Sequence, residues 1–242
     1  MMIMNYSGIG KNKMTETNNH SQVSFSYFNQ IVPDIEIKEC NNSLIDKIIS
    51  DNHYSKKVTS NRWKSFAVYY NGKLEGGMQI GYGIRPEQKE HIMEGATSEN
   101  IKEFDRMWLS DKMPKNSESR CIGWLIKYLR KNYPELKALI SYADGLRNKT
   151  GVIYQASNFI YLGYVDGEFY YIPSKDEWVH PVSMYHRHGT RAIKTLKDIY
   201  PDVQHIRGKQ HRYIYFIDRG WRRKLKIKPV KYPESPNNIY TR

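Results

Sequence analysis

Cysteine is scarce in this 242-residue chain, which contains only Cys40 and Cys121. Two thiols are too few for a disulfide framework or for a thiolate zinc site. Long apolar runs are also missing, because no uninterrupted stretch approaches the roughly 20 residues that span a bilayer. The first residues, MMIMNYSGIGKNKM, contain no continuous apolar segment of the kind found in secretory signals. We therefore expect a cytoplasmic protein with no membrane partner.

Acidic residues are scarce in the last quarter of the chain. Residues 180–242 contain 15 Lys and Arg against 4 Asp and Glu, a net charge of +11 within the total of +13. Positive charge concentrated in this way attracts a polyanion, and nucleic acid is the commonest one in a cytosol. A solubilising tail is the alternative. The predicted DNA contacts are Lys194, Lys197, Arg207, Lys209, Arg212, Arg219, Arg222, Arg223, Lys224, Lys226 and Lys228.

Three regions follow from composition and pattern. Residues 1–33 are polar and show no sustained period, which is typical of a flexible arm, with one short strand at 23–28 as an option. Residues 34–178 carry the alternating strand and helix patterns of an α/β domain. Residues 179–242 are predicted to form a basic C-terminal extension that contacts DNA.

Hydrophobic periodicity predicts the elements of the α/β domain. A strand at 34–40 precedes a helix capped by Asn42 or Ser43, and Asn71-Gly72 joins two strands as a hairpin. The later elements alternate between strand and helix, which indicates parallel pairing. We therefore expect a mixed, partly parallel sheet with helices on both faces. The other predicted strands are 65–70, 74–82, 101–109, 138–140, 159–164, 168–172 after a turn at Asp166-Gly167, and 212–217; the other helices are 120–131, one bearing Tyr154, and 190–199.

The stretch from 136 to 164 contains the first indication of chemistry. A short apolar run ends in Ser141, Tyr142 and Asp144, and the helix that follows carries Tyr154. A strand that ends in an Asp opposite a helix that carries a Tyr is typical of α/β enzyme sites. For Tyr154 alone, packing on an amphipathic helix is the simpler interpretation.

The order of elements resembles the GNAT acyltransferase fold, in which a loop before a helix binds the pyrophosphate of a cofactor. Here that position is NSESRCIG, residues 116–123, with Ser117 and Ser119 in place of glycines and Arg120 after them. These three residues are the predicted cofactor contacts. The usual Gly-rich loop is absent, which counts against acyl-CoA and leaves the donor open. Tyr154 falls where that fold commonly has a general acid.

Four motifs in order, DNHYSKK, EFDRMWLSDKMPKNSESR, SYADG and GVIYQASNF, together resemble the Mom DNA-modification proteins of Mu-like phages. The match covers roughly residues 51–164 and continues through GKQHRYIYF. The resemblance implies an enzyme that adds a carbamoylmethyl group to the N6 amine of adenine in DNA, which hides restriction sites. Its substrate would be double-stranded phage DNA in the host cytoplasm.

The resemblance also implies functional positions. They are His53, Tyr54, Arg106, Ser119, Asp144 and Tyr154. Within that family a His, Tyr, Asp and Tyr set has been proposed to bind iron, and all four residues are present. This set is not the common two-His-one-carboxylate pattern. Proton removal by Asp144 or His53 is the alternative role, with Arg106 holding negative charge or forming an ion pair with Asp105 or Asp111.

Two other functions stay open at this point. One is an acyl-CoA-dependent N-acyltransferase that acts on a protein or a small amine. The other is a nucleic-acid-binding protein without catalytic activity that keeps an enzyme fold. The source of the transferred group, the sequence around the target, base flipping and a homodimeric state are open as well.

Overall fold

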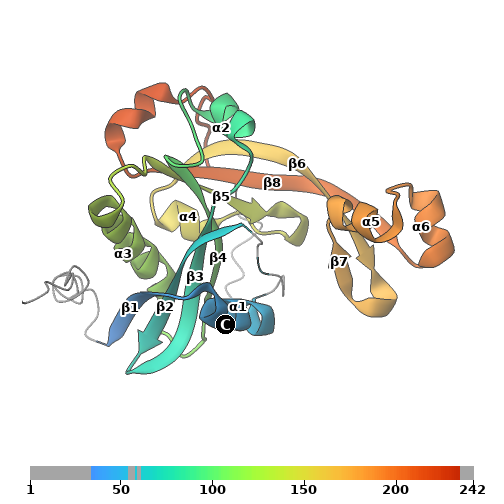
Figure 1. Ribbon diagram of the computed structural model, residues 1–242, viewed down its shortest axis with the longest axis horizontal. Coiled ribbons are helices and arrows are strands. Elements are labelled where there is room, and N and C mark those ends of the chain that lie inside the picture. Colours follow the sequence, from blue (N-terminus) through green and yellow to red (C-terminus); the bar gives the residue numbers. More distant parts are fainter. Residues whose placement is uncertain (1–33, 54–57, 59–60, 235–242) are drawn as a thin grey trace, which may run out of the picture.

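One mixed sheet forms the centre of the protein (Figure 1). The computed structural model describes residues 34–53, 58 and 61–234, and within them eight strands follow the order β1-β2-β3-β4-β5-β8-β6-β7. The strands are β1 Ile35–Cys40, β2 Arg62–Tyr70, β3 Lys73–Gly81, β4 Ile101–Leu109, β5 Ala138–Asp144, β6 Ile160–Ile172, β7 Glu177–Val179 and β8 Gln204–Phe216. The predicted arm at 1–33 lies outside the described residues.

Helices lie on both faces of this sheet. They are α1 Asn42–Asn52, α2 Pro86–Ile92, α3 Ser117–Asn132, α4 Val152–Ala156, α5 Pro181–His188 and α6 Ile193–Ile199, with 3-10 turns η1 Gly145–Arg147, η2 Pro173–Lys175 and η3 Arg219–Lys224. In the described part of the chain, no helix is long and apolar enough to cross a membrane.

The two-residue period of β2 divides the core between the faces. Phe66 and Val68 pack in the cluster under α3, whereas Ala67 packs against α1. On α1, Ile45 and Ile49 are fully buried, and each contributes about 1.5–3 kcal/mol of transfer free energy. The alternation therefore places α3 and α4 on one face and α1 on the other.

β4 and β5 are the parallel pair of the described sheet, and the other pairings are antiparallel. The predicted mixed, partly parallel sheet with helices on both faces is confirmed. Parallel pairing is less extensive than the alternation predicted, because β8 pairs antiparallel with both β5 and β6. Residues 204–216 fall within the predicted basic extension, yet they form a strand inside the central sheet. A separate C-terminal extension is not confirmed.

β6 and β8 run out of the main body together and carry a small second unit, which we call the outer lobe (residues 168–205; Figure 1). It contains the ends of these strands with β7, α5 and α6. Its own cluster includes Tyr170, Ile172, Met184 and Leu196. The face of its sheet that points away from this cluster carries Phe169, Tyr171 and Trp178, since these residues alternate with the buried ones.

The turn predicted at Asp166-Gly167 is wrong. β6 continues through it, with Asp166 opposite Lys209 and Gly167 opposite Gly208. A side-chain carbon added at Gly208 would overlap Leu146 of η1. The glycine therefore allows η1 to approach the strand, which is the role that glycine often has inside a strand.

Other elements differ at their ends or were not predicted. α3 begins at Ser117 rather than at 120, and α2, α5 and β7 lie in segments for which no element was predicted. The hairpin is confirmed, because Asn71 and Gly72 both have positive φ, 51° and 74°. Turn chemistry therefore predicted the hairpin at Asn71-Gly72 but not the continuous strand at Asp166-Gly167, and it did not predict the outer lobe.

Candidate active site

Polar side chains gather where β4 and β5 separate. The two strands pair only from Ile101 to Glu103, opposite Ala138 to Ile140. Beyond that point Ser141 Oγ bridges the gap by donating to the carbonyl oxygen of Phe104 at 2.7 Å. Beyond this point of the described sheet, β4 pairs only with β3 and β5 only with β8, so the two strands diverge and their side chains border a gap in the sheet.

A β-bulge in β4 changes the direction of its side chains. Gln79 pairs with Arg106 and Ile80 with Phe104, which leaves Asp105 as the extra residue. Phe104 and Met107 pack under α3. Glu103 and Arg106 precede these two residues, so both face the other side of the sheet, where α1 lies.

Asp144 ends β5 and belongs to the same face as Arg106. Its Oδ2 lies 3.7 Å from Arg147 Nε, whereas its Oδ1 is buried without a hydrogen-bond partner among the described residues. Burial raises the pKa of Asp144, and Arg147, the backbone N–H groups of Leu146 and Arg147, and then Arg106 oppose that rise. An unpartnered buried oxygen costs about 1–3 kcal/mol, so Oδ1 is a position for a ligand.

His53 follows the end of α1 and is 7% exposed. Burial, followed by the charges of Arg106 and Arg147, lowers the pKa of His53 from 6.5 to about 4. The same two guanidinium groups act on Asp144. The structure thus brings His53, Arg106 and Asp144 into one electrostatic environment and keeps the imidazole neutral at neutral pH.

Two further acidic residues of β4, Glu103 and Asp105, adjoin this group. Burial raises the pKa of Glu103 to about 8, and the charge of Asp105 and a hydrogen bond with it add to the rise, while Arg106 opposes it. Gly83, at φ +70°, allows this packing, since an added side-chain carbon would lie 2.7 Å from Glu103 Cβ. Burial and the neighbouring carboxyl of Asp105 therefore favour the protonated form of Glu103.

Tyr154 is 8% exposed and lies in the aromatic part of the main cluster. Its ring centroid lies 6.3 Å from that of Phe104, 5.4 Å from Phe159 and 5.3 Å from Tyr213. It belongs to the face of the sheet that α3 and α4 cover. Asp144 follows Ala143 of that cluster along β5, so its side chain points to the opposite face. Tyr54, the neighbour of His53, lies outside the described residues.

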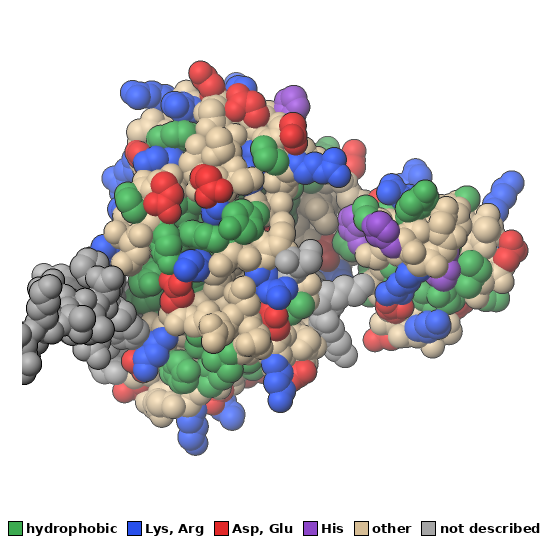
Figure 2. All heavy atoms as spheres, in the orientation of Figure 1, with side chains coloured by type: hydrophobic (Ala, Val, Ile, Leu, Met, Phe, Trp, Pro, Cys, Tyr) green, Lys and Arg blue, Asp and Glu red, His purple; other side chains and the backbone are tan. Residues whose placement is uncertain are grey.

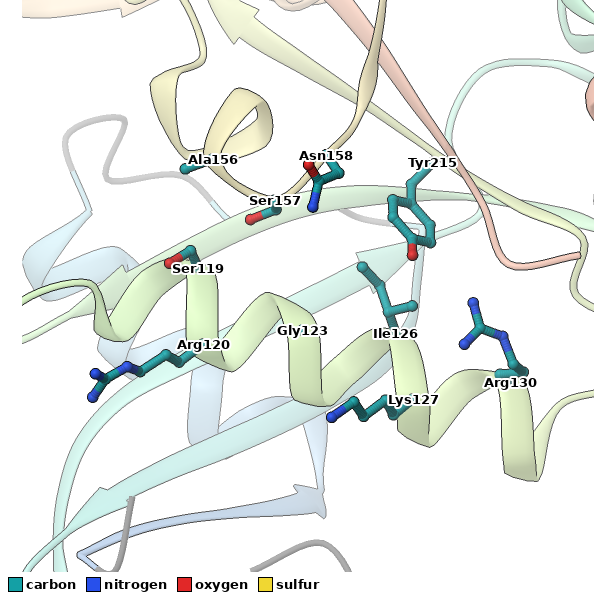
Figure 3. A pocket seen from close by; sticks show the side chains of 10 residues that line it. All are labelled: Ser119, Arg120, Gly123, Ile126, Lys127, Arg130, Ala156, Ser157, Asn158 and Tyr215. Carbon is teal, nitrogen blue, oxygen red and sulfur yellow. The ribbon is translucent and has the colours of Figure 1, made fainter. Parts of the chain in front are cut away.

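A groove of about 280 Å³ lies between α3 and α4 (Figure 3). Ser119, Ser157, Asn158 and Tyr215 extend into the space between the helices, and Arg120 extends from the outer side of α3. The remaining lining residues are Gly123, Ile126, Lys127, Arg130 and Ala156.

Of the predicted cofactor contacts, Ser119 and Arg120 line this groove. Ser119 Oγ donates to the carbonyl oxygen of Asn116 at 3.1 Å. Ser117 is buried, and its Oγ donates to the carbonyl oxygen of Pro114 at 2.6 Å. Because α3 starts at Ser117, the expected loop is the first turn of a helix.

The model of the Mom protein family matches residues 34–234. The chain belongs to the Mom family. A relative, the methylcarbamoylase mom of Escherichia phage Mu, is 34% identical over 191 residues, which make up 78% of this chain and 78% of that protein. The resemblance expected from four motifs is confirmed, and the match extends beyond them to residue 234.

Solved acetyltransferase structures are also similar to this Mom-family chain. Arabidopsis thaliana NAA60 in complex with acetyl-CoA has a TM-score of 0.45 and 10% identity, and the match covers 75% of this chain and 99% of that one. A Salmonella typhimurium acetyltransferase that modifies the N-terminal serine of a 50S ribosomal subunit protein has a TM-score of 0.42 and 10% identity, with 78% and 98% covered.

The basic residues of the Mom-family chain are not gathered in one patch on the face that Figure 2 shows. There, Lys and Arg are spread over the body and the outer lobe, with acidic side chains among them. Phe216 pairs with Ala138 and Gln210 with Asp144. η3, which follows β8, therefore lies about 20 Å along β5 from the Asp144 tip, at ~3.3 Å per residue.

The individual predicted DNA contacts also differ in exposure. Arg212 is half-buried beside Tyr142, and its Nη2 lies 3.4 Å from the carbonyl oxygen of Leu162. Lys226 forms a 2.6 Å ion pair with Glu90. The exposed members are Lys194, Lys197, Arg207, Lys209, Arg219, Arg222, Arg223, Lys226 and Lys228.

His53 and Asp144 would suit a metal in part. A neutral imidazole and an unpartnered carboxylate oxygen are ligands that iron accepts. Two guanidinium groups beside them oppose a cation, however, and among the described residues no three His, Cys, Asp or Glu side chains gather for a metal. The implied iron set therefore stays a prediction.

Sequence reasoning missed Glu103, Arg147 and Trp178. Arg147 could have been noticed, because it follows Asp144 by three residues, the spacing of one turn. No sequence pattern marks Trp178, because only the tertiary structure brings β7 next to Arg147.

Proposed function

We propose that this Mom-family protein is a DNA-modifying transferase that converts adenine to N6-carbamoylmethyladenine in double-stranded phage DNA and so protects it from host restriction. The observation that carries the proposal is Asp144 Oδ1, a buried carboxylate oxygen without a partner among the described residues, at the point where β4 and β5 separate. The phage Mu relative supplies the reaction class.

The N6 amine needs help because its lone pair is delocalised into the purine ring. Asp144 would accept one N6 proton as N6 bonds to the methylene carbon of the donor, whose leaving group departs with the electron pair. His53 is the weaker base, because the low pKa of about 4 gives it little tendency to take a proton at neutral pH. Arg106 would hold the negative charge that develops on the donor.

Iron is a further part of the proposal. His53 and Asp144, with Tyr54 from the implied set, would hold it, and it would supply Lewis-acid chemistry when bound. Tyr154 of the implied set packs on the opposite face of the sheet from Asp144 and would not be a ligand there. No step above depends on the iron.

The groove between α3 and α4 supports a donor site on the opposite face from Asp144. Ser119, Arg120, Lys127 and Arg130 give it a polar and cationic lining, which suits a donor with an anionic part. Tyr154 packs on the same face and would act there as the general acid for the leaving group. The adenine amine and the donor of the transferred group would then approach the gap between β4 and β5 from opposite faces of the sheet.

Expression in bacteria tests the function directly. Cellular DNA is digested to nucleosides, and mass spectrometry detects an adenosine heavier by one carbamoylmethyl group. We expect the group in cells with the wild-type protein and its loss with Asp144→Asn or Tyr154→Phe. Asp111→Asn, an exposed acid, is the control. Unmodified adenine despite soluble protein would overturn the function, whereas full modification by both site variants would overturn the site.

A further inference from the structure

Arg147 connects the tip of β5 to the outer lobe. Its Nε lies 3.7 Å from Asp144 Oδ2, and its guanidinium lies over the indole of Trp178, 4.8 Å from the ring centroid. Tyr171 of β6 packs against the same indole at 4.9 Å between centroids. Two distant parts of the chain therefore hold one guanidinium.

This arrangement decides which oxygen of Asp144 is available. Oδ2 faces Arg147, and the backbone N–H groups of Leu146 and Arg147 face the carboxylate without closing a cap hydrogen bond. Oδ1 is buried and lacks a partner among the described residues. A carboxylate oxygen in this state can accept a hydrogen bond, and an amine is a donor of the right kind.

The position of Arg147 depends on the outer lobe. η1 is a single 3-10 turn, so its three residues have little internal support. Trp178 belongs to β7, whose three residues pair with β6, and the lobe's own cluster supports both strands. The lobe thus supplies the indole against which the guanidinium rests.

We propose that Arg147 is a positioning residue of the adenine-modifying site: held on Trp178, it fixes Asp144 through Oδ2 so that Oδ1 accepts a hydrogen bond from the N6 amine of the target base. This inference rests on the proposed function. It makes the outer lobe part of the active site.

The experiment compares modified adenine in cells that express equal soluble amounts of each variant. Arg147→Met and Trp178→Ala should each lower the rate of modification about tenfold to a hundredfold, since a displaced catalytic group can cost that much. Trp178→Phe, which keeps a ring under the guanidinium, and Arg147→Lys, which keeps the charge, should recover much of the loss. The controls are Trp221→Phe, from a second cation–π pair with Lys224, and the exposed Arg85→Met.

A double variant separates positioning from a structural role. If Trp178 acts through Arg147, the double variant of Arg147→Met and Trp178→Ala should modify DNA no more slowly than Arg147→Met alone. The purified variants should also keep the thermal unfolding midpoint and the DNA affinity of the wild type.

Three results would overturn the inference while wild-type modification stands. They are a double variant that modifies DNA more slowly than Arg147→Met alone, no recovery of the rate by Trp178→Phe, and full modification by Arg147→Met. Absence of modified adenine in the wild type and both controls would instead overturn the proposed function.

Discussion

Gly208 of β8 lies directly against Leu146 of η1, so closely that a side-chain carbon at Gly208 would overlap Leu146 Cδ2. Leu146 stands between Gly145 and Arg147, and Asp144 precedes this turn. The absence of a side chain at position 208 therefore sets how near the acidic tip of β5 can come to the long strand pair.

Gly208→Ala should move η1 and with it Asp144. We expect an overpacking cost of about 1–3 kcal/mol in unfolding free energy, measured by denaturant titration, and a clear drop in modified adenine. Gly123→Ala is the matched control for stability, because no atom lies within 4 Å of the added carbon. A Gly208→Ala protein with the stability of this control and the activity of the wild type would show that the close approach has no role.

Basic residues at the two ends of β8 should contribute differently to DNA binding. Replacing Arg207 and Lys209 with Gln should lower the slope of log affinity against log salt by up to about 1.8, since each lost phosphate contact removes about 0.9. Modification should fall in parallel, because these residues flank Gly208, which lies beside η1.

The matched pair is Arg222 and Arg223 in η3, about 20 Å along β5 from Asp144. We expect their Gln variants to lower the salt slope by a similar amount with less effect on modification. If neither pair changes the slope, the basic residues do not contact phosphate. Point variants are preferable to truncation after Ile217, because Tyr232 donates a hydrogen bond to Phe159 and Trp221 packs against the core.

Glu103 should make stability depend on pH. Its pKa in the folded protein is raised to about 8, above the ordinary value of 4.5, so the folded state binds more protons than the unfolded state between these values. The contribution is fully present below pH 4.5 and is lost as pH rises to about 8. Glu103→Gln should therefore flatten the unfolding free energy over this window, measured by denaturant titration at several pH values. The exposed Glu87→Gln should retain the wild-type slope; an identical slope in Glu103→Gln would contradict the assignment.

Iron can be tested without an activity assay. After anaerobic loading with ferrous iron and removal of excess metal, elemental analysis should find bound iron in the wild-type protein. His53→Ala and Asp144→Ala should lose it, because they remove a neutral imidazole and an unpartnered carboxylate oxygen. The exposed His91→Ala is the control. Wild-type protein that retains no iron would leave proton transfer as the role of Asp144.

Local sequence determined a good part of this fold. Asn71-Gly72 predicted the hairpin because both residues tolerate positive φ, and Ile101–Leu109 was predicted with the bounds that the structure has. The motifs that include His53, Arg106 and Asp144 also predicted residues that share one electrostatic environment. These features depend on side-chain types and short periods, which a single sequence displays directly.

Tertiary structure alone decided the rest. The Asp166-Gly167 dipeptide has turn chemistry, yet β6 continues through it because β8 pairs with it from the far end of the chain. The same pairing moves residues 204–216 from a tail into the sheet, divides the basic residues between two ends, and brings Trp178 to Arg147. The raised pKa of Glu103 likewise arises from burial beside Asp105. Pairings between distant segments and the burial they cause depend on the whole chain, so no local pattern could predict them.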